Sequence, residues 1–213
     1  DWYWDRGNRQ LEHWLHEGYM NARFRRYLKW AVMWANHHPV GSHSASDWRE
    51  VTQYWIDHYF GMDQYYRIDG KPAVFIWAPE NIRSDVGGSR QAAELYAMSQ
   101  AMARKAGYPG IFFVAMHGHH SGAAAAELRA DGYQGMTSYH AFQRAMRQAE
   151  GRRFPFEDVV RTSPEVWRQQ DEHAGRMLSI PLADTGWSSE PWHGREARVI
   201  YGRTPEWFGQ LCR

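Results

Sequence analysis

Five short clusters of polar and aromatic residues each follow a run of apolar residues. In chain order they read Trp34-Ala-Asn36-His37-His38, Trp77-Ala-Pro-Glu80-Asn81, His117-Gly-His119-His120, Tyr139-His140, and Asp184-Thr-Gly-Trp187-Ser-Ser-Glu190-Pro-Trp192. Aromatic rings cover the apolar C–H face of a sugar, and Asn, His and carboxylate groups hydrogen-bond its hydroxyls. If the clusters meet in space, they form an aromatic, hydrogen-bonding pocket with few cations, which suits a neutral sugar.

The apolar runs that precede the clusters are predicted strands. They cover residues 28–36, 73–77, 111–116, 133–139 and 177–184, and helical patterns over 47–59, 89–106, 123–129, 164–176 and from 204 onward alternate with them. Strands that are apolar on both faces and separated by helices indicate a parallel sheet covered by helices. Such sheets bind their ligands at the carboxyl ends of the strands, where all five clusters are expected.

Two α/β architectures fit this order of elements: a doubly wound open sheet and a (β/α)8 barrel. The glycine-containing segments 41–44 and 85–89 lack the spacing of either nucleotide-binding fingerprint. Their absence weakens the doubly wound, nucleotide-binding alternative. At the helix starts, four residues are predicted caps: Asn8, Asp47, Ser163 (with Pro164 at the first helical position) and Thr204.

Composition excludes several classes of function. The 213 residues carry 25 Lys and Arg against 24 Asp and Glu, so a formal charge of +1 gives no general electrostatic reason to bind nucleic acid. No run approaches the ~18 apolar residues of a membrane span. The single cysteine rules out an internal disulfide framework, and no motif calls for a cofactor. Twelve Trp and twelve Tyr suit both a large aromatic core and sugar stacking. We expect a secreted or periplasmic protein rather than a cytoplasmic one.

Five pieces of the sequence together resemble the glycoside hydrolase family 99-like proteins of bacteria. They are Asp1–Gly7 (DWYWDRG), Met33–His37 (MWANH), Asp69–Trp77 (DGKPAVFIW), Thr185–Trp192, and Thr204–Leu211 in the closing RTPEWFGQLCR. They span nearly the whole chain in the family's order. The resemblance implies a (β/α)8 TIM barrel that acts on glycans, with endo-α-mannosidases as the best-known relatives. It also implies one partial domain over residues 1–213, from about the end of strand 2 through helix 7.

The resemblance further places the recognised pair of catalytic glutamates beyond Arg213, in an Asn-Glu-Trp-type stretch. It implies retention, in which the sugar's own 2-hydroxyl attacks and one carboxylate acts as its base. Nine residues of this chain are then expected to bind the substrate: Trp4, Asp5, Trp34, Asn36, His37, Trp77, His117, Tyr139 and Trp187. On this interpretation the opening DWYWDRG is the end of a barrel strand and its loop.

Three alternatives stay open. Glycoside hydrolysis needs two carboxyl groups. Within this chain, Glu80 could pair with Asp184 or with Glu190 as acid and base. If they are not catalytic, Glu80 is a helix-capping or loop carboxylate, and Asp184 bonds loop amides. The same pocket without a carboxylate pair is a carbohydrate-binding module or a degenerate barrel. A metal-dependent hydrolase would use a histidine cluster drawn from His37, His38, His117, His119, His120 and His140.

One basic segment remains, residues 144–153 (RAMRQAEGRR). Such a segment is usually a solvated extension. It also has the charge to border the pocket and contact phosphate or acid groups on a glycan.

Overall fold

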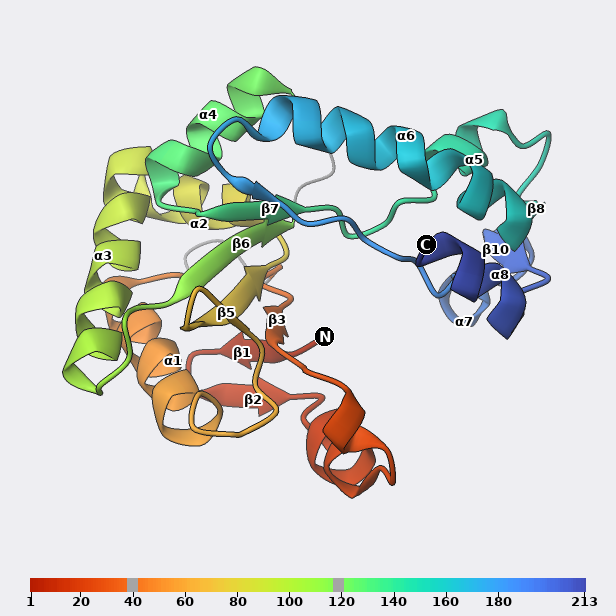
Figure 1. Cartoon of the computed structure of the whole chain (residues 1–213). Helices are drawn as coiled ribbons and strands as arrows, with labels where there is room; N and C mark the ends of the chain where they lie inside the picture. Colours follow the sequence, from red (N-terminus) through yellow and green to blue (C-terminus); the bar gives the residue numbers. More distant parts are fainter. Residues whose placement is uncertain (38–41, 117–120) are drawn as a thin grey trace.

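A parallel sheet forms the centre of the molecule in the computed structural model, which describes residues 1–37, 42–116 and 121–213 (Figure 1). Its strand order is β3-β5-β6-β7-β9, and every neighbouring pair in that path is parallel. The bounds are Val32–Trp34 for β3, Lys71–Ile76 for β5, Phe112–Met116 for β6, Gly135–Thr137 for β7 and Leu178–Ser179 for β9. The five predicted strands and their parallel pairing are thereby confirmed.

The sheet is open among the residues that the structure describes. No pairing there joins β9 back to β3, so closure into a barrel is not seen. At the β3 edge, Trp2 forms a parallel bridge with Trp34, and the Trp2 amide donates to the Met33 carbonyl at 2.9 Å. The first residues of the chain therefore lie beside β3 as a further strand would. Strand β4 (Arg67–Ile68) pairs antiparallel with the first residues of β5.

Helices cover one face of this sheet. They are α1 (Ala45–His58), α2 (Pro79–Val86), α3 (Ser89–Lys105), α4 (Gly122–Asp131) and α6 (Phe156–Ala174). Figure 1 shows α1 and α3 at the left of the strands, and α4 and α6 above them. The main core fills the space between these layers and holds large rings such as Trp34, Trp48 and Trp55, all fully buried.

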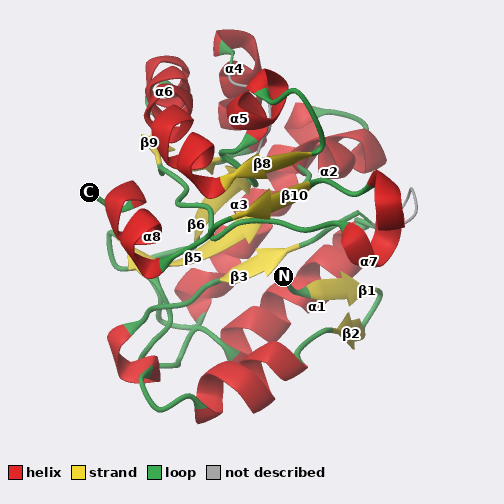
Figure 2. Ribbon diagram, turned by 90° about the vertical axis from the view of Figure 1, so that its right-hand side faces the viewer, coloured by secondary structure: helices red, strands yellow, loops and turns green. Residues whose placement is uncertain are grey.

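The C-terminal part builds a second, smaller core. It contains α5 (Gln143–Gln148), β8 (Arg153–Pro155), α7 (Glu190–His193), β10 (Val199–Tyr201) and α8 (Pro205–Leu211), with α6 packed against it. Strands β8 and β10 form a separate parallel pair, visible side by side in Figure 2. The core residues include Phe142, Phe154, Phe156 and Ile200. Arg153–Pro155 form strand β8, and Phe156 begins α6 directly after it.

The N-terminal hairpin was not predicted. Strands β1 (Tyr3–Asp5) and β2 (Asn8–Gln10) pair antiparallel around Arg6 and Gly7, whose φ angles of 47° and 83° fit a two-residue hairpin turn. Asn8 therefore lies in a strand and caps no helix. The following segment has short turns only: a π turn at Trp14–Gly18 and 3₁₀ turns at Tyr19–Asn21 and Arg25–Tyr27.

Two predicted helix starts are wrong for local reasons. Ser44, not Asp47, caps α1, because its hydroxyl accepts the Asp47 amide at 3.2 Å. Helix α6 begins at Phe156 and contains Pro164 in its interior, and the Ser163 hydroxyl donates back to the Val159 carbonyl at 2.7 Å. The Thr204 cap of α8 is confirmed by its contact with the Trp207 amide. Within the described ranges, no helix has the length and apolar character of a membrane span.

Candidate functional site

Seven aromatic and imidazole rings lie in one continuous series at the carboxyl ends of the strands. We call this series the aromatic strip; it consists of Tyr3, His37, Trp77, Tyr139, His140, Trp187 and Trp192. Successive ring centroids are 5.3, 4.9, 6.0, 4.4, 5.0 and 6.0 Å apart. Because each ring touches the next, the strip brings together residues from four of the five predicted clusters.

The members of the strip remain accessible. His37 and Trp192 are exposed, and the other five rings are half-buried. The indoles of Trp187 and Trp192 are parallel to within 4°, and Trp192 is 71% exposed. Near the middle, the Tyr139 hydroxyl contacts Asp1 Oδ2 at 3.4 Å, and partial burial raises the pKa of Tyr139. The strip therefore offers apolar ring faces and hydroxyl, imidazole and carboxylate groups along one surface.

Two residues predicted to stack on a sugar, Trp34 and Trp4, are instead buried in the core. Trp34 is 0% exposed and packs against Trp48 and Trp55, so its ring has no face for a ligand. Trp4 is 5% exposed, and its indole N–H donates to Asp47 Oδ1 at 2.9 Å. Both side chains support the sheet from its helix-covered side. The tryptophans of the strip are Trp77, Trp187 and Trp192 instead.

Asn36 is also buried, and its amide is occupied by the backbone. Its Nδ2 donates to the Ala78 carbonyl at 2.8 Å, and the Ala78 N–H donates to its Oδ1 at 2.7 Å. The predicted contact with a sugar hydroxyl therefore does not fit. The side chain ties the end of β3 to the turn that follows β5, and so holds His37 beside Trp77.

Asp184 plays a similar part at the far end of the strip. It is 6% exposed; Oδ2 accepts the Ala141 amide at 2.5 Å and Oδ1 lies 3.3 Å from His140 Nδ1. Both oxygens are thus engaged, as expected for a carboxylate that bonds loop amides. The His140 ring lies between those of Tyr139 and Trp187 in the strip, at centroid distances of 4.4 and 5.0 Å.

The remaining candidates have different surroundings. Asp5 lies at the end of β1 and forms an ion pair with Arg6 at 3.0 Å. Glu80 is exposed in the first turn of α2, and Glu190 is exposed in α7, where Ser188 and Arg153 lower its pKa by hydrogen bonding. His117 lies outside the described residues.

The metal alternative receives no support from the residues that the structure describes. No three His, Cys, Asp or Glu side chains of that part gather closely enough to hold a metal ion. His37 and His140 are both placed in the aromatic strip rather than together. His38, His119 and His120, which completed the predicted cluster, lie outside the described ranges, as His117 does.

One buried carboxylate, Asp47, lies in the core and is not a member of the strip. Asp47 accepts from Trp4 through Oδ1, while its Oδ2 is buried without a hydrogen-bond partner among the described residues. Burial raises its pKa, because the charged form loses solvation. Asp47 is therefore a destabilising charge at neutral pH that the Trp4 contact only partly offsets.

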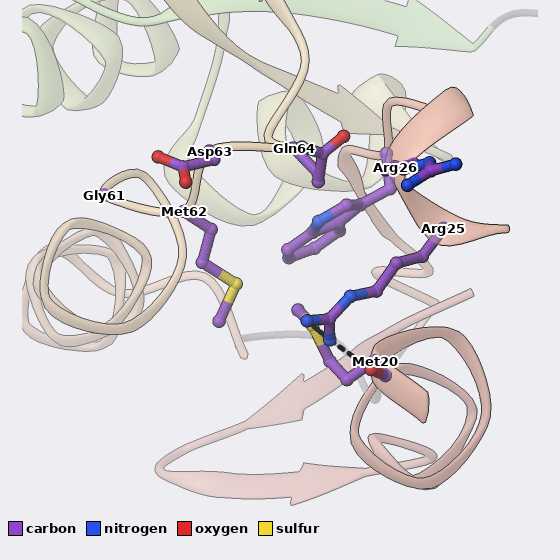
Figure 3. A pocket seen from close by; sticks show the side chains of 8 residues that line it. Met20, Arg25, Arg26, Gly61, Met62, Asp63 and Gln64 are labelled. Carbon is purple, nitrogen blue, oxygen red and sulfur yellow. Dashed lines mark hydrogen bonds between the residues drawn. The ribbon is translucent and has the colours of Figure 1, made fainter. Parts of the chain in front are cut away.

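A separate cavity of about 480 Å³ lies at the amino end of β3, away from the strip. It is lined by Met20, Arg25, Arg26, Trp30 and residues 61–64. Figure 3 shows the Arg25 side chain crossing toward Met20, to whose carbonyl it donates. In barrel-type α/β proteins this end of the strands serves stability more than ligand binding. We therefore do not include this cavity in the candidate site.

Sequence reasoning missed three members of the strip as binding residues: Tyr3, His140 and Trp192. His140 and Trp192 belong to the predicted strand-end clusters, so the signal was present. Tyr3 had a weaker signal, since alternation in a strand places it opposite its neighbours Trp2 and Trp4. Those two are buried, and Tyr3 is half-buried beside His37.

Comparison with known proteins agrees with this geometry. A family model described as "Glycosyltransferase WbsX" matches residues 2–213. No functionally curated protein sequence matches the chain. Among solved structures, the GH99 endo-α-mannosidase from Bacteroides thetaiotaomicron is similar at 19% identity and a TM-score of 0.56, over 98% of this chain and 56% of that one.

Two further solved structures are similar in fold at comparably low sequence identity. The GH99 endo-α-mannosidase in complex with bis-tris propane matches at 19% identity and a TM-score of 0.53, over 92% of this chain and 55% of that chain. A glycoside hydrolase-like protein matches at 16% identity and a TM-score of 0.51, over 86% and 55%. This chain spans about half the length of these proteins, and the resemblance to family 99-like proteins is confirmed. The chain belongs to the family described as glycosyltransferase WbsX, with an α/β fold similar to that of the GH99 endo-α-mannosidases.

Proposed function

We propose that the aromatic strip binds a glycan chain. The observation that carries this proposal is the unbroken contact between seven accessible rings at the carboxyl ends of a parallel sheet. A pyranose ring buries its C–H face on an indole, and successive sugars of a chain need successive platforms. Trp77 and the Trp187–Trp192 pair provide such platforms at two places along the strip.

We further propose that the chain forms part of a (β/α)8 barrel whose complete protein acts on glycosidic bonds. Its similarity to glycoside hydrolases of known structure supports hydrolysis, with retention and an α-mannoside as the first substrate to test. The acid and base are assigned to carboxylates other than Asp184, because that side chain is buried with both oxygens occupied. Glutamates beyond Arg213 are the proposed pair, and exposed Glu80 is the secondary candidate.

The binding proposal is tested by titration calorimetry with an α-manno-oligosaccharide. Trp77→Ala and Trp187→Ala should each weaken affinity about tenfold or more, equivalent to ~1.4 kcal/mol. The matched control is Tyr27→Ala, an aromatic residue that is 67% exposed in the 3₁₀ turn before β3. Equal affinity of all three variants and the unaltered chain would remove the strip from the site.

A second experiment separates hydrolysis from transfer, because the family description names a glycosyltransferase. The complete protein is incubated with an α-mannan oligosaccharide, and new reducing ends are followed by proton NMR. In parallel, a mixture of nucleotide sugars and acceptor glycan is assayed for released nucleotide. New reducing ends without nucleotide release support the hydrolase, and the opposite result supports a transferase that uses the same glycan-binding strip.

A further inference from the structure

A second cavity, of about 620 Å³, lies where the aromatic strip reaches the C-terminal part of the chain. It is lined by Arg152, Arg153, Glu190, Gly194, Arg195 and Ala197. Arg153 is the first residue of β8 and Arg152 precedes it, whereas Glu190 lies in α7, Gly194 and Arg195 lie in the 3₁₀ turn after it, and Ala197 follows that turn. The cavity therefore has two walls of different origin, and both carry arginine.

The positive charge of this cavity exceeds what the chain itself neutralises. Arg153 pairs with Glu190 at 3.1 Å, and Arg152 pairs with Glu196 and donates to its carbonyl at 2.6 Å. Arg195 makes neither a hydrogen bond nor an ion pair with any residue in the described ranges, so its charge is surplus. The pairs that do form are more than half exposed, and exposed ion pairs contribute at most about 1 kcal/mol. A bound oxyanion can therefore displace them at little cost.

The two walls are tied to the strip through β10. Val199 is in register with Arg153 on one side and forms an antiparallel bridge with Ser188 on the other. The Ile200 amide also donates to the Trp187 carbonyl at 2.8 Å. These backbone contacts fix Trp187 relative to β8. The cavity and the stacked indoles are thus parts of one folded unit, in which β8 and β10 lie side by side (Figure 2).

Helix α7 places the exposed indole and the cavity within one turn of each other. Trp192 and Glu190 both lie on this helix, and Arg195 follows it directly. Trp192 stacks on Trp187 and leaves 71% of its surface exposed. A sugar stacked on this indole would have its substituents close to the arginines.

We propose that this cavity binds an oxyanion substituent, a carboxylate or a phosphate, on the glycan that occupies the aromatic strip. The inference rests on the proposed glycan-binding function and adds the chemical class of the glycan. Arginine is suited to this role because its planar guanidinium donates two parallel hydrogen bonds to a carboxylate or a phosphate. The substrate is then an acidic glycan, rather than the neutral sugar that the strand-end clusters alone suggested.

The test compares acidic and neutral probes that differ in one group. Trigalacturonic acid is titrated against its methyl ester, and mannose 6-phosphate against mannose, by calorimetry or ligand-observed NMR. We expect the acidic member of one pair to bind about three- to tenfold more tightly, with a preference that declines as salt rises. A preference in the first pair identifies a uronic acid, and a preference in the second identifies a phosphate.

Variants assign the preference to the cavity. Arg195→Gln should abolish most of the acid preference without changing affinity for the neutral probe, whereas Trp192→Ala should weaken both members of a pair. Arg104→Gln is the matched control, because Arg104 is an exposed arginine in the last turn of α3. Its acid preference should equal that of the unaltered chain.

Two results would overturn the inference. One is equal affinity for the acidic and neutral members of both pairs, or no binding of either acid. The other is an acid preference that survives both Arg195→Gln and Arg152→Gln. Neither result would affect the proposed glycan-binding function, which is judged separately by Trp77→Ala and Trp187→Ala with the manno-oligosaccharide.

Discussion

Asn36 joins the ends of two strands beneath the aromatic strip, and its replacement by alanine should destabilise the sheet. Its side chain is fully buried and makes two hydrogen bonds to the backbone of Ala78, at 2.7 and 2.8 Å. Ala78 is itself only 3% exposed. Water therefore cannot replace the lost partner at either backbone group without local opening of the structure.

The size of the effect depends mainly on the Ala78 N–H, because the Ala78 carbonyl also accepts the Asn81 amide at 3.1 Å. Each buried N–H or C=O left without a partner costs about 1–3 kcal/mol. Asn36→Ala leaves the Ala78 N–H unpaired and also removes buried atoms, so we expect a loss of about 2–4 kcal/mol in the free energy of unfolding. This is a large part of the ~5–15 kcal/mol that stabilises a typical domain.

The assay is urea denaturation followed by tryptophan fluorescence, with Asn21→Ala as the control. Asn21 is exposed and also bonds two carbonyls, at 3.0 and 3.2 Å, so its loss should cost less than about 1 kcal/mol. Equal, small losses for the two variants would refute the reasoning. Unchanged stability of Asn36→Ala together with weaker glycan binding would return Asn36 to the role of a sugar ligand.

Two further changes test the burial of other predicted residues. Trp34→Ala should lower the free energy of unfolding by about 3–5 kcal/mol in the same urea assay, because the ring is completely buried. Asp47 has a folded-state pKa above its ordinary value of 3.8, so its contribution to stability should decline as pH rises through the interval between the two values. Urea midpoints measured from acid to neutral pH should show that this decline is absent in Asp47→Asn.

The strands were predictable because nearly all residues of a strand are buried, on both faces of the sheet. Segments such as 111–116 carry apolar residues on both faces, and that pattern has few alternatives once helices separate the segments. The same argument located the carboxyl ends of the strands and hence the aromatic strip. Helix starts were less predictable, since Asp47 and Ser44 are both good caps and only the backbone geometry selects Ser44.

The roles of individual tryptophans depended on register, which the sequence does not provide. Trp34 is the last residue of β3 and lies opposite Ile76 of β5, so both side chains point into the helix-covered core. Trp77 is one position further along and faces the other way, because strand side chains alternate. A shift of one residue thus separates a core ring from a ring of the strip.

A buried polar residue holds each half of the aromatic strip in place, through hydrogen bonds to other groups of the chain. Asn36 lies under His37 and Trp77, and Asp184 fixes His140 through its imidazole nitrogen and the adjacent amide. Asn36 was predicted as a sugar ligand because an amide suits sugar hydroxyls, and Asp184 was predicted as a catalytic candidate or a carboxylate that bonds loop amides. Their actual contacts hold the exposed rings in place before any ligand arrives, which reduces the entropy lost on binding. A glycan site needs exposed residues that contact the sugar and buried polar residues that position them, and the burial of a side chain distinguishes the two kinds.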